Sequence, residues 1–119
     1  MSKPTRVIFI GKAKEEYMRL NAIVGEQIKE GKTNSREIQL LKSIKQKLEL
    51  IRLNPFYGDN IKKYLIPKEY NVDNLWRTEL SQFWRMLYTI KGDYIEIICF
   101  ILDIIDHLTY NKKFGYRKR

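Results

Sequence analysis

The chain has 119 residues and a net charge of +9, from 23 Lys and Arg against 14 Asp and Glu. This length suits one domain, residues 1–119, and is too short for two ordinary domains. A single Cys and a single His exclude an internal disulfide and a multi-histidine metal site, and the longest apolar stretch, residues 95–105, is too short to span a bilayer.

The first half of the chain predicts a strand followed by two helices. Val7–Ile10 is a short, mainly β-branched run, typical of a strand. Apolar residues recur at helical spacing over residues 12–30 and again over residues 34–54. Asn34 is the expected N-cap of the second helix, with Glu37 as its capping-box partner. We expect the two helices to be antiparallel and to cover one face of a sheet.

The second half predicts mainly β structure after an irregular segment at residues 59–73. Three candidate strands follow, bounded by turn residues: Leu75–Leu80, Trp84–Lys91 and Tyr94–Leu102. Gly92 and Asp93 suit a two-residue turn between the last two strands, and a short helical turn is expected from Asp106. The predicted fold is α+β, with a short N-terminal strand, two antiparallel helices packed on one face of a mainly antiparallel sheet of about four strands, and a basic C-terminal tail.

The pairing of the strands can be predicted from the requirement that apolar residues share one face. A three-residue loop at residues 81–83 places Glu79 opposite Arg85 and Arg77 opposite Leu87, whereas a two-residue loop would mix the faces. The second hairpin, with its two-residue turn, pairs Tyr88 with Ile97. The apolar back of the sheet would then pack under the helices, and it consists of Trp84, Met86, Tyr88, Ile90, Ile95, Ile97, Cys99 and Ile101. Cys99 is expected to be a buried, inert thiol.

The opposite face of the sheet carries the residues that suggest chemistry. Arg77 and Arg85 lie on strands whose other face is core, and guanidinium groups held in this way bind phosphate with two hydrogen bonds. Glu79 can accept a proton or can be a structural counter-ion of Arg85. His107, just after the last strand, can transfer a proton near neutral pH or can be an ordinary surface histidine. The sequence pattern leaves both of these alternatives open.

Basic groups near aromatic residues predict contact with nucleic acid. The residues expected to bind RNA are Lys62, Lys63, Lys112, Lys113 and Arg117. Tyr110, Phe114 and Tyr116 are interleaved with the last of them, as in proteins that stack single-stranded bases, and a solvated basic tail is the alternative. Asp103 and His107, even with a further acid beside them, lack a full set of metal ligands, so no metal and no cofactor is expected.

The order of elements and two strand motifs resemble the RelE/ParE superfamily of toxins from type II toxin–antitoxin systems. The motifs are Leu75-Trp-Arg-Thr-Glu-Leu80 and Trp84-Arg-Met-Leu-Tyr88, followed by an apolar strand and then a His with a nearby Tyr. The resemblance covers roughly residues 7–110. It implies a metal-independent, ribosome-dependent mRNA endoribonuclease, in which the 2′-hydroxyl of the message attacks the adjacent phosphate.

The resemblance also implies roles for individual residues. Arg85 matches the phosphate-binding arginine of the family, and Arg77 matches a basic residue on the preceding strand. His107 and Tyr110 resemble the C-terminal elements that protonate the leaving 5′-oxygen or stack a base. Glu79 departs from the family pattern, because relatives commonly carry a second basic residue there as the general base. Glu79 is therefore either a carboxylate base or the mark of a chain without nuclease activity.

The partners implied by the resemblance are a cognate antitoxin, the ribosome and mRNA, in the cytoplasm and with no membrane. Leu87, Ile98 and Phe100 on the front face would form an apolar groove for a partner's helix or strand. Two other functions compete with the nuclease. One is a ParE-like inhibitor that binds DNA gyrase and catalyses nothing, and the other is a basic nucleic-acid-binding module.

Overall fold

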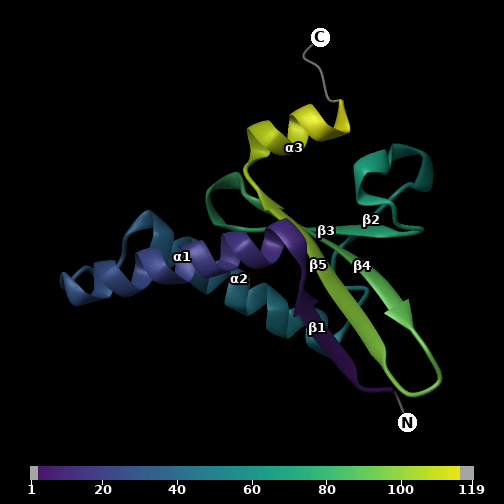
Figure 1. The fold of residues 1–119 in the computed structure, drawn as a ribbon, viewed down its shortest axis with the longest axis horizontal. Coiled ribbons are helices and arrows are strands. Elements are labelled where there is room, and N and C mark those ends of the chain that lie inside the picture. Colours follow the sequence, from purple (N-terminus) through teal and green to yellow (C-terminus); the bar gives the residue numbers. More distant parts are fainter. Residues whose placement is uncertain (1–2, 116–119) are drawn as a thin grey trace.

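A computed structural model describes residues 3–115 and contains a five-stranded sheet in the order β1-β5-β4-β3-β2 (Figure 1). The elements are β1 (Thr5–Phe9), α1 (Gly11–Lys29), α2 (Arg36–Leu53), β2 (Asp59–Ile61), β3 (Leu75–Glu79), β4 (Arg85–Gly92), β5 (Ile97–Ile105) and α3 (His107–Phe114). β1 pairs in parallel with β5, and every other pair is antiparallel. The α+β class is confirmed, with five strands rather than four. Within the described residues, no helix combines the length and apolar character needed to cross a membrane.

The two long helices lie side by side and project beyond the sheet (Figure 1). Ser35, not Asn34, caps α2, since its hydroxyl accepts a hydrogen bond from the backbone N–H of Ile38 at 3.1 Å. Glu37 is not a capping-box partner. Its carboxylate accepts a hydrogen bond from Gln27 of α1 at 2.8 Å, which lowers its pKa. The Ser35 hydroxyl also contacts Gln27, so these bonds tie the free ends of the two helices together.

The back of the sheet packs under these helices and forms the larger core. Met86, Tyr88, Cys99 and Ile101 are fully buried there among apolar residues of α1 and α2. Burial raises the pKa of the Cys99 thiol to about 11, which agrees with the prediction of an inert group. Ile95 is the exception among the residues predicted for this face, because it lies in a loop and is 75% exposed.

The hairpin between β4 and β5 has a four-residue loop rather than the predicted two-residue turn. Gly92 pairs with Ile97, and the carboxylate of Asp93 accepts hydrogen bonds from the backbone N–H groups of Ile95 at 2.7 Å and Glu96 at 2.9 Å. The pairing of Tyr88 with Ile97 was therefore wrong, and Tyr88 pairs with Ile101 instead. The partner of Tyr88 moves by four residues, an even number, so the same side chains still share a face up to Ile101, beyond which a β-bulge at Leu87 and Tyr88 shifts the pairing by one more residue.

The hairpin between β3 and β4 has the predicted register. Glu79 pairs with Arg85, and Arg77 pairs with Leu87. The loop at residues 81–83 is a tight turn, and the backbone N–H of Leu80 donates to the carbonyl of Trp84 at 2.8 Å. The backbone N–H of Ser81 donates to the Ser43 hydroxyl of α2 at 3.0 Å, which fixes the hairpin against the helix layer.

A second, smaller core covers much of the front of the sheet. Its buried members are Ile61, Leu75, Leu87, Ile105 and Tyr110, with side chains from residues 62–74 and α3 packed around them. Leu87 is fully buried, and Ile98 and Phe100 are half-buried, so the predicted open apolar groove does not exist. The segment predicted to be irregular contains β2, which pairs with β3, and two 3₁₀ turns.

Candidate active site on the front of the sheet

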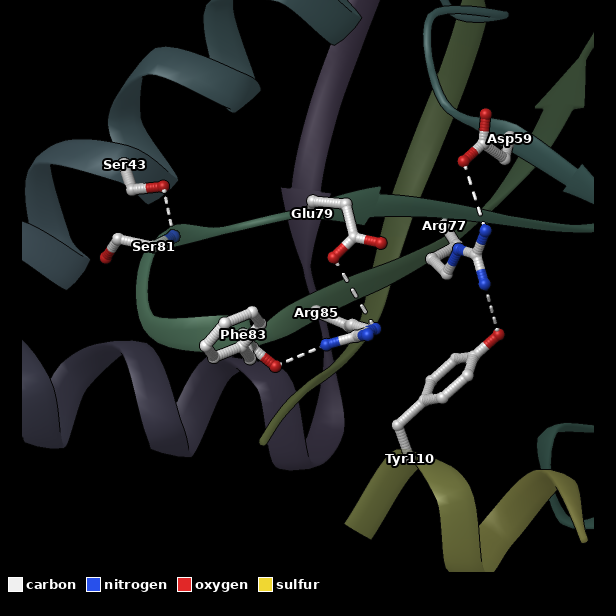
Figure 2. Close-up of polar contacts among 8 residues, drawn as sticks. All are labelled: Ser43, Asp59, Arg77, Glu79, Ser81, Phe83, Arg85 and Tyr110. Atoms are coloured by element: carbon white, nitrogen blue, oxygen red, sulfur yellow. Dashed lines mark hydrogen bonds and ion pairs between the residues drawn. The ribbon is translucent and has the colours of Figure 1, made fainter. Parts of the chain in front are cut away.

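Arg77 lies on β3 and is held by hydrogen bonds on two sides (Figure 2). Its Nη1 donates to the hydroxyl of Tyr110 at 2.9 Å, and its Nη2 donates to the carboxylate of Asp59 at 3.2 Å. Burial lowers the pKa of Arg77, but the contacts with Tyr110 and Asp59 outweigh it, so the net pKa lies above the ordinary value. The guanidinium is therefore a fixed cation with one defined orientation.

Arg85 lies on the adjacent strand, β4, and its side chain is only 16% exposed. Its Nη1 donates to the backbone carbonyl of Phe83, and its Nε lies 3.6 Å from the Glu79 carboxylate (Figure 2). Among the described residues, the Nε atoms of Arg77 and Arg85 are both buried without a hydrogen-bond partner. Each arginine thus retains an unused donor beneath the site.

The ring of Tyr110 brings the two arginines to one place. The guanidinium carbon of Arg85 lies 5.2 Å from the ring centre, and that of Arg77 lies 5.6 Å from it. Tyr110 is buried and stacks on Phe114 of α3, with ring centres 4.3 Å apart. Cations over a tyrosine ring are attracted by its π electrons. α3, which the sequence predicts only as a helical turn, therefore covers both arginines.

Two carboxylates of the site are accessible, that of Asp59, which is 69% exposed beside Arg77, and that of Glu79. The Glu79 side chain is 55% exposed, and its separation of 3.6 Å from Arg85 is longer than a good hydrogen bond. A long contact of this kind with an exposed carboxylate contributes about 0.2–1 kcal/mol to stability. The geometry therefore leaves the Glu79 carboxylate free to accept a proton from a bound molecule.

His107 begins α3 and is exposed. Its ring packs edge-on against Phe83 at 5.9 Å, and the carbonyl of Phe83 is the group that binds Arg85. The histidine is thus connected to the arginine site through Phe83. Asp106 caps α3 by accepting a hydrogen bond from the backbone N–H of Thr109 at 2.8 Å, which lowers its pKa. That bond fixes the start of the helix that carries His107 and Tyr110.

A polar cluster beside the site fastens α3 to the segment before β3. The hydroxyl of Tyr70 donates to the buried carboxylate of Asp103 at 2.8 Å, and burial, followed by this contact, raises the pKa of Tyr70. Lys113 of α3 pairs with Glu69 and lies 4.0 Å from Asp103. Lys113 therefore has a structural partner, and an RNA phosphate would have to compete with Glu69 for its ammonium group.

The remaining residues predicted to bind RNA are dispersed. Lys62 and Lys63 are exposed at the end of β2, and Lys112 is exposed on α3. Arg117 lies outside the described residues. No group of three or more His, Cys, Asp and Glu that could hold a metal ion occurs within residues 3–115.

Sequence reasoning missed two partners of the arginines, Asp59 and the carbonyl of Phe83. Asp59 reaches Arg77 only because β2 pairs with β3. A strand of three residues is too short to show an alternation of polar and apolar residues, so the sequence did not predict β2. The Phe83 carbonyl is presented by a turn in which Gln82 and Phe83 have φ of 60° and 64°. A turn without glycine gave no signal for that conformation.

Comparison with known proteins bears on the fold. No family model and no curated protein matches the chain. Among solved structures, the chain is similar to a YoeB/ParE toxin from Agrobacterium tumefaciens, with a TM-score of 0.58 and 10% sequence identity, over 86% of this chain and 98% of that chain. The likeness shows that the chain shares the fold of this toxin, which agrees with the fold expected from its resemblance to the RelE/ParE superfamily.

Proposed function

We propose that this protein is the toxin of a type II toxin–antitoxin pair and that it cleaves mRNA on the ribosome without a metal ion. One observation carries the proposal. Two arginines from neighbouring strands meet a carboxylate and a buried tyrosine on one face of a fold shared with a YoeB/ParE toxin. A cognate antitoxin, which would neutralise the toxin, and the ribosome are the partners that this function requires.

The chemistry uses the residues in distinct roles. A base removes the proton from the 2′-hydroxyl of the message, the resulting oxygen attacks the adjacent phosphorus, and the bond to the 5′-oxygen breaks as that oxygen takes up a proton. Glu79 is the better placed base, because its carboxylate is exposed and lies 3.6 Å from Arg85, beyond a good hydrogen bond, whereas the carboxylate of Asp59 accepts a hydrogen bond from Arg77 at 3.2 Å. Arg77 and Arg85 would stabilise the negative charge that develops on the phosphate oxygens.

Proton donation to the leaving oxygen falls to Tyr110 or His107. The hydroxyl of Tyr110 lies 2.9 Å from Nη1 of Arg77, within the site, whereas His107 stands at its border against Phe83. A phosphate that binds Nη1 of Arg77 would replace the hydroxyl of Tyr110 on that nitrogen. Substrate binding is therefore expected to move α3 or to turn the tyrosine side chain.

A second function is favoured if the contacts of the two arginines are structural rather than catalytic. Each arginine already has partners within the protein, and Glu79 stands where relatives commonly carry a basic residue. These features fit a non-catalytic, ParE-like inhibitor of DNA gyrase, in which the arginines are structural. A basic nucleic-acid-binding module is a third possibility, which requires neither Glu79 nor Tyr110.

Mapping of mRNA 5′ ends after induced expression separates these functions. The nuclease predicts new 5′ ends within translated messages, their loss when translation is blocked, and their loss in an Arg85→Ala variant. Purified protein should cleave naked RNA poorly. Toxicity without new 5′ ends, accompanied by inhibition of gyrase, would support the second function instead. Efficient cleavage of bare RNA at many sites would overturn the dependence on the ribosome.

A further inference from the structure

The candidate active site opens into a furrow between the outer edge of β3 and the helix α2. Two adjoining hollows form it, and both are lined by Lys47 and Glu79. The first hollow also contains Arg77, Asp59 and Tyr57, and the second continues along α2 past Gln46 to Lys42. The furrow thus connects the arginine site to a helix that sequence reasoning assigned to the core alone.

The furrow exists because β2 begins opposite Arg77 and does not extend alongside Glu79. Asp59, the first residue of β2, pairs with Arg77, so no strand lies outside Glu79. The backbone N–H of Leu80 donates to the carbonyl of Trp84, the residue before β4, and backbone groups alternate in direction along a strand. The N–H and carbonyl of Glu79 therefore face the outer edge. The furrow is therefore bounded on one side by the backbone N–H and carbonyl of Glu79, which can form hydrogen bonds, and on the other side by α2.

The uncompensated charge of the furrow is positive. Asp59 and Glu79 are each paired with an arginine of the site. No ion pair among the described residues involves Lys42 or Lys47. Lys47 Nζ donates instead to the neutral hydroxyl of Tyr57 at 3.1 Å. Two unpaired ammonium groups beside a groove attract a polyanion, and most of the affinity of such contacts comes from phosphate.

The groove also offers an aromatic surface. Tyr57 is 38% exposed, and Lys47 lies over one side of its ring at 5.4 Å. Aromatic rings next to lysines bind single-stranded nucleic acid by stacking bases while the lysines bind the backbone. The furrow does not have to be wide enough for a double helix, because the substrate of the proposed reaction is a single RNA strand.

We propose that the furrow carries the RNA strand on one side of the cleavage site, with Lys42 and Lys47 bound to phosphates of the flanking nucleotides. This inference rests on the proposed function for the identity of the strand. It assigns the strand a path across the edge of β3 and along α2, away from α3. It differs from the path expected from the sequence, which ran along Lys62, Lys63 and the basic tail.

The test is the salt dependence of RNA binding by a Lys42→Gln/Lys47→Gln variant. A fluorescent single-stranded oligoribonucleotide with 2′-O-methyl groups, which has no free 2′-hydroxyl and so cannot be cleaved, is titrated with the protein over a range of salt concentrations. Loss of two phosphate contacts should reduce the slope of log K against log salt by about 1.4, since each contact contributes about 0.7 for a single strand. Binding at low salt should weaken at least about tenfold, because each released counterion adds to affinity.

The matched control is Lys14→Gln/Lys45→Gln. It makes the same change in net charge, and Lys45 lies on α2 but on its other side, 6.0 Å from the ring of Tyr17 on α1. This control should keep the parent slope. Thermal unfolding shows whether both double variants are folded. If both are folded and have equal affinities and equal slopes of log K against log salt, the furrow is not the RNA path.

The binding assay contains no ribosome, so its result is separate from that of the 5′-end mapping. If messages are cleaved but the two double variants bind RNA alike, the furrow is wrong and the nuclease stands. If no message is cleaved but the slope falls only in Lys42→Gln/Lys47→Gln, the nuclease is wrong and the furrow stands as a site for single-stranded RNA.

Discussion

The hydroxyl of Tyr110 accepts a hydrogen bond from Nη1 of Arg77 at 2.9 Å, although 33 positions separate the two residues in the chain. Through this bond α3 is attached to β3 at the point where the candidate site lies. The same hydroxyl would be available to a leaving oxygen once a phosphate replaced it on Arg77. Tyr110 therefore combines a structural contact with a chemical group in the site.

Replacement of Tyr110 by Phe tests both roles of this hydroxyl. We expect the free energy of unfolding to fall by about 1.5–3 kcal/mol, because the hydrogen bond from the charged Arg77 is lost while the ring still packs on Phe114. Urea denaturation measures this change, and Tyr64→Phe is the control, since Tyr64 is 80% exposed. If the hydroxyl also donates the proton, cleavage falls while RNA binding is retained. Unchanged stability would show that the bond to Arg77 is unimportant.

An Arg85→Ala variant should lose toxicity. Loss of one group that binds the developing charge typically lowers the rate by about 10²–10³-fold, or about 2.7–4 kcal/mol. Because Arg85 is largely buried and contacts Phe83 and Tyr110, some loss of stability is also expected. The circular dichroism spectrum and melting temperature show whether the variant folds.

Arg85→Lys serves as the companion variant, because lysine keeps the positive charge but cannot bind phosphate with two parallel donors. It should be intermediate in toxicity. A folded Arg85→Ala protein that kills cells at the parent rate would remove this arginine from the site.

Glu79→Gln separates a base from a counter-ion. Glutamine keeps the size of the side chain but cannot accept the proton, so cleavage should fall by about 10²–10⁴-fold if Glu79 is the base. Stability should change by less than about 1 kcal/mol, because the Glu79 carboxylate is exposed and its contact with Arg85 is long. The rate of message cleavage in a translation extract provides the measurement.

His107→Gln is compared in the same assay, since His107 is the other candidate for proton transfer. Full cleavage by Glu79→Gln together with an inactive His107→Gln would assign the chemistry to α3. Faster cleavage by Glu79→Gln would indicate that the carboxylate only restrains Arg85.

Gly58→Ala should destabilise the protein. A Cβ at this position would lie 2.7 Å from the carbonyl oxygen of Arg77 and 2.9 Å from the hydroxyl of Tyr88. That hydroxyl is buried, donates to Pro55 at 2.8 Å and accepts from Gly58, and burial raises its pKa to about 12. Relief of the clash requires movement of β3, so we expect a loss of about 1–3 kcal/mol in unfolding free energy.

Gly25→Ala is the matched control for this substitution. Gly25 lies in α1, and a Cβ there would meet nothing within 4 Å. Alanine should stabilise the helix by about 0.5–1 kcal/mol, since glycine is the poorer helix former. Equal effects of the two substitutions in urea denaturation would contradict the close approach at Gly58.

The strands that carry the arginines could be predicted from the sequence, because a wrong register between β3 and β4 would place polar residues in the core. The same reasoning gave the correct faces for β5 even though the turn was wrong. Gly92 and Asp93 form a common turn pair, but the Asp93 carboxylate binds two backbone N–H groups further along and so favours the longer loop. A local dipeptide signal cannot include that side-chain contact.

The front of the molecule could not be predicted in this way. Ile61 and Tyr110 come from two separate segments, and neither segment shows the spacing that marks an amphipathic element. Both residues belong to the same buried cluster as Leu87. The bond between Asp59 and Arg77 has the same origin, because it follows from a long-range strand pair rather than from a local pattern.

The parallel pairing of β1 with β5 has a consequence for the order in which the protein can be built. β1 is the first strand to leave the ribosome, but its partner is the last strand of the sheet to be synthesised. Until then, β1 has no strand to pair with, and the sheet that α1 and α2 cover is incomplete. Contacts between residues distant in the sequence must therefore form together. Folding of the sheet in the nascent chain is therefore delayed until β5 has emerged, and the arginine site is assembled only after β5 and α3 have been translated.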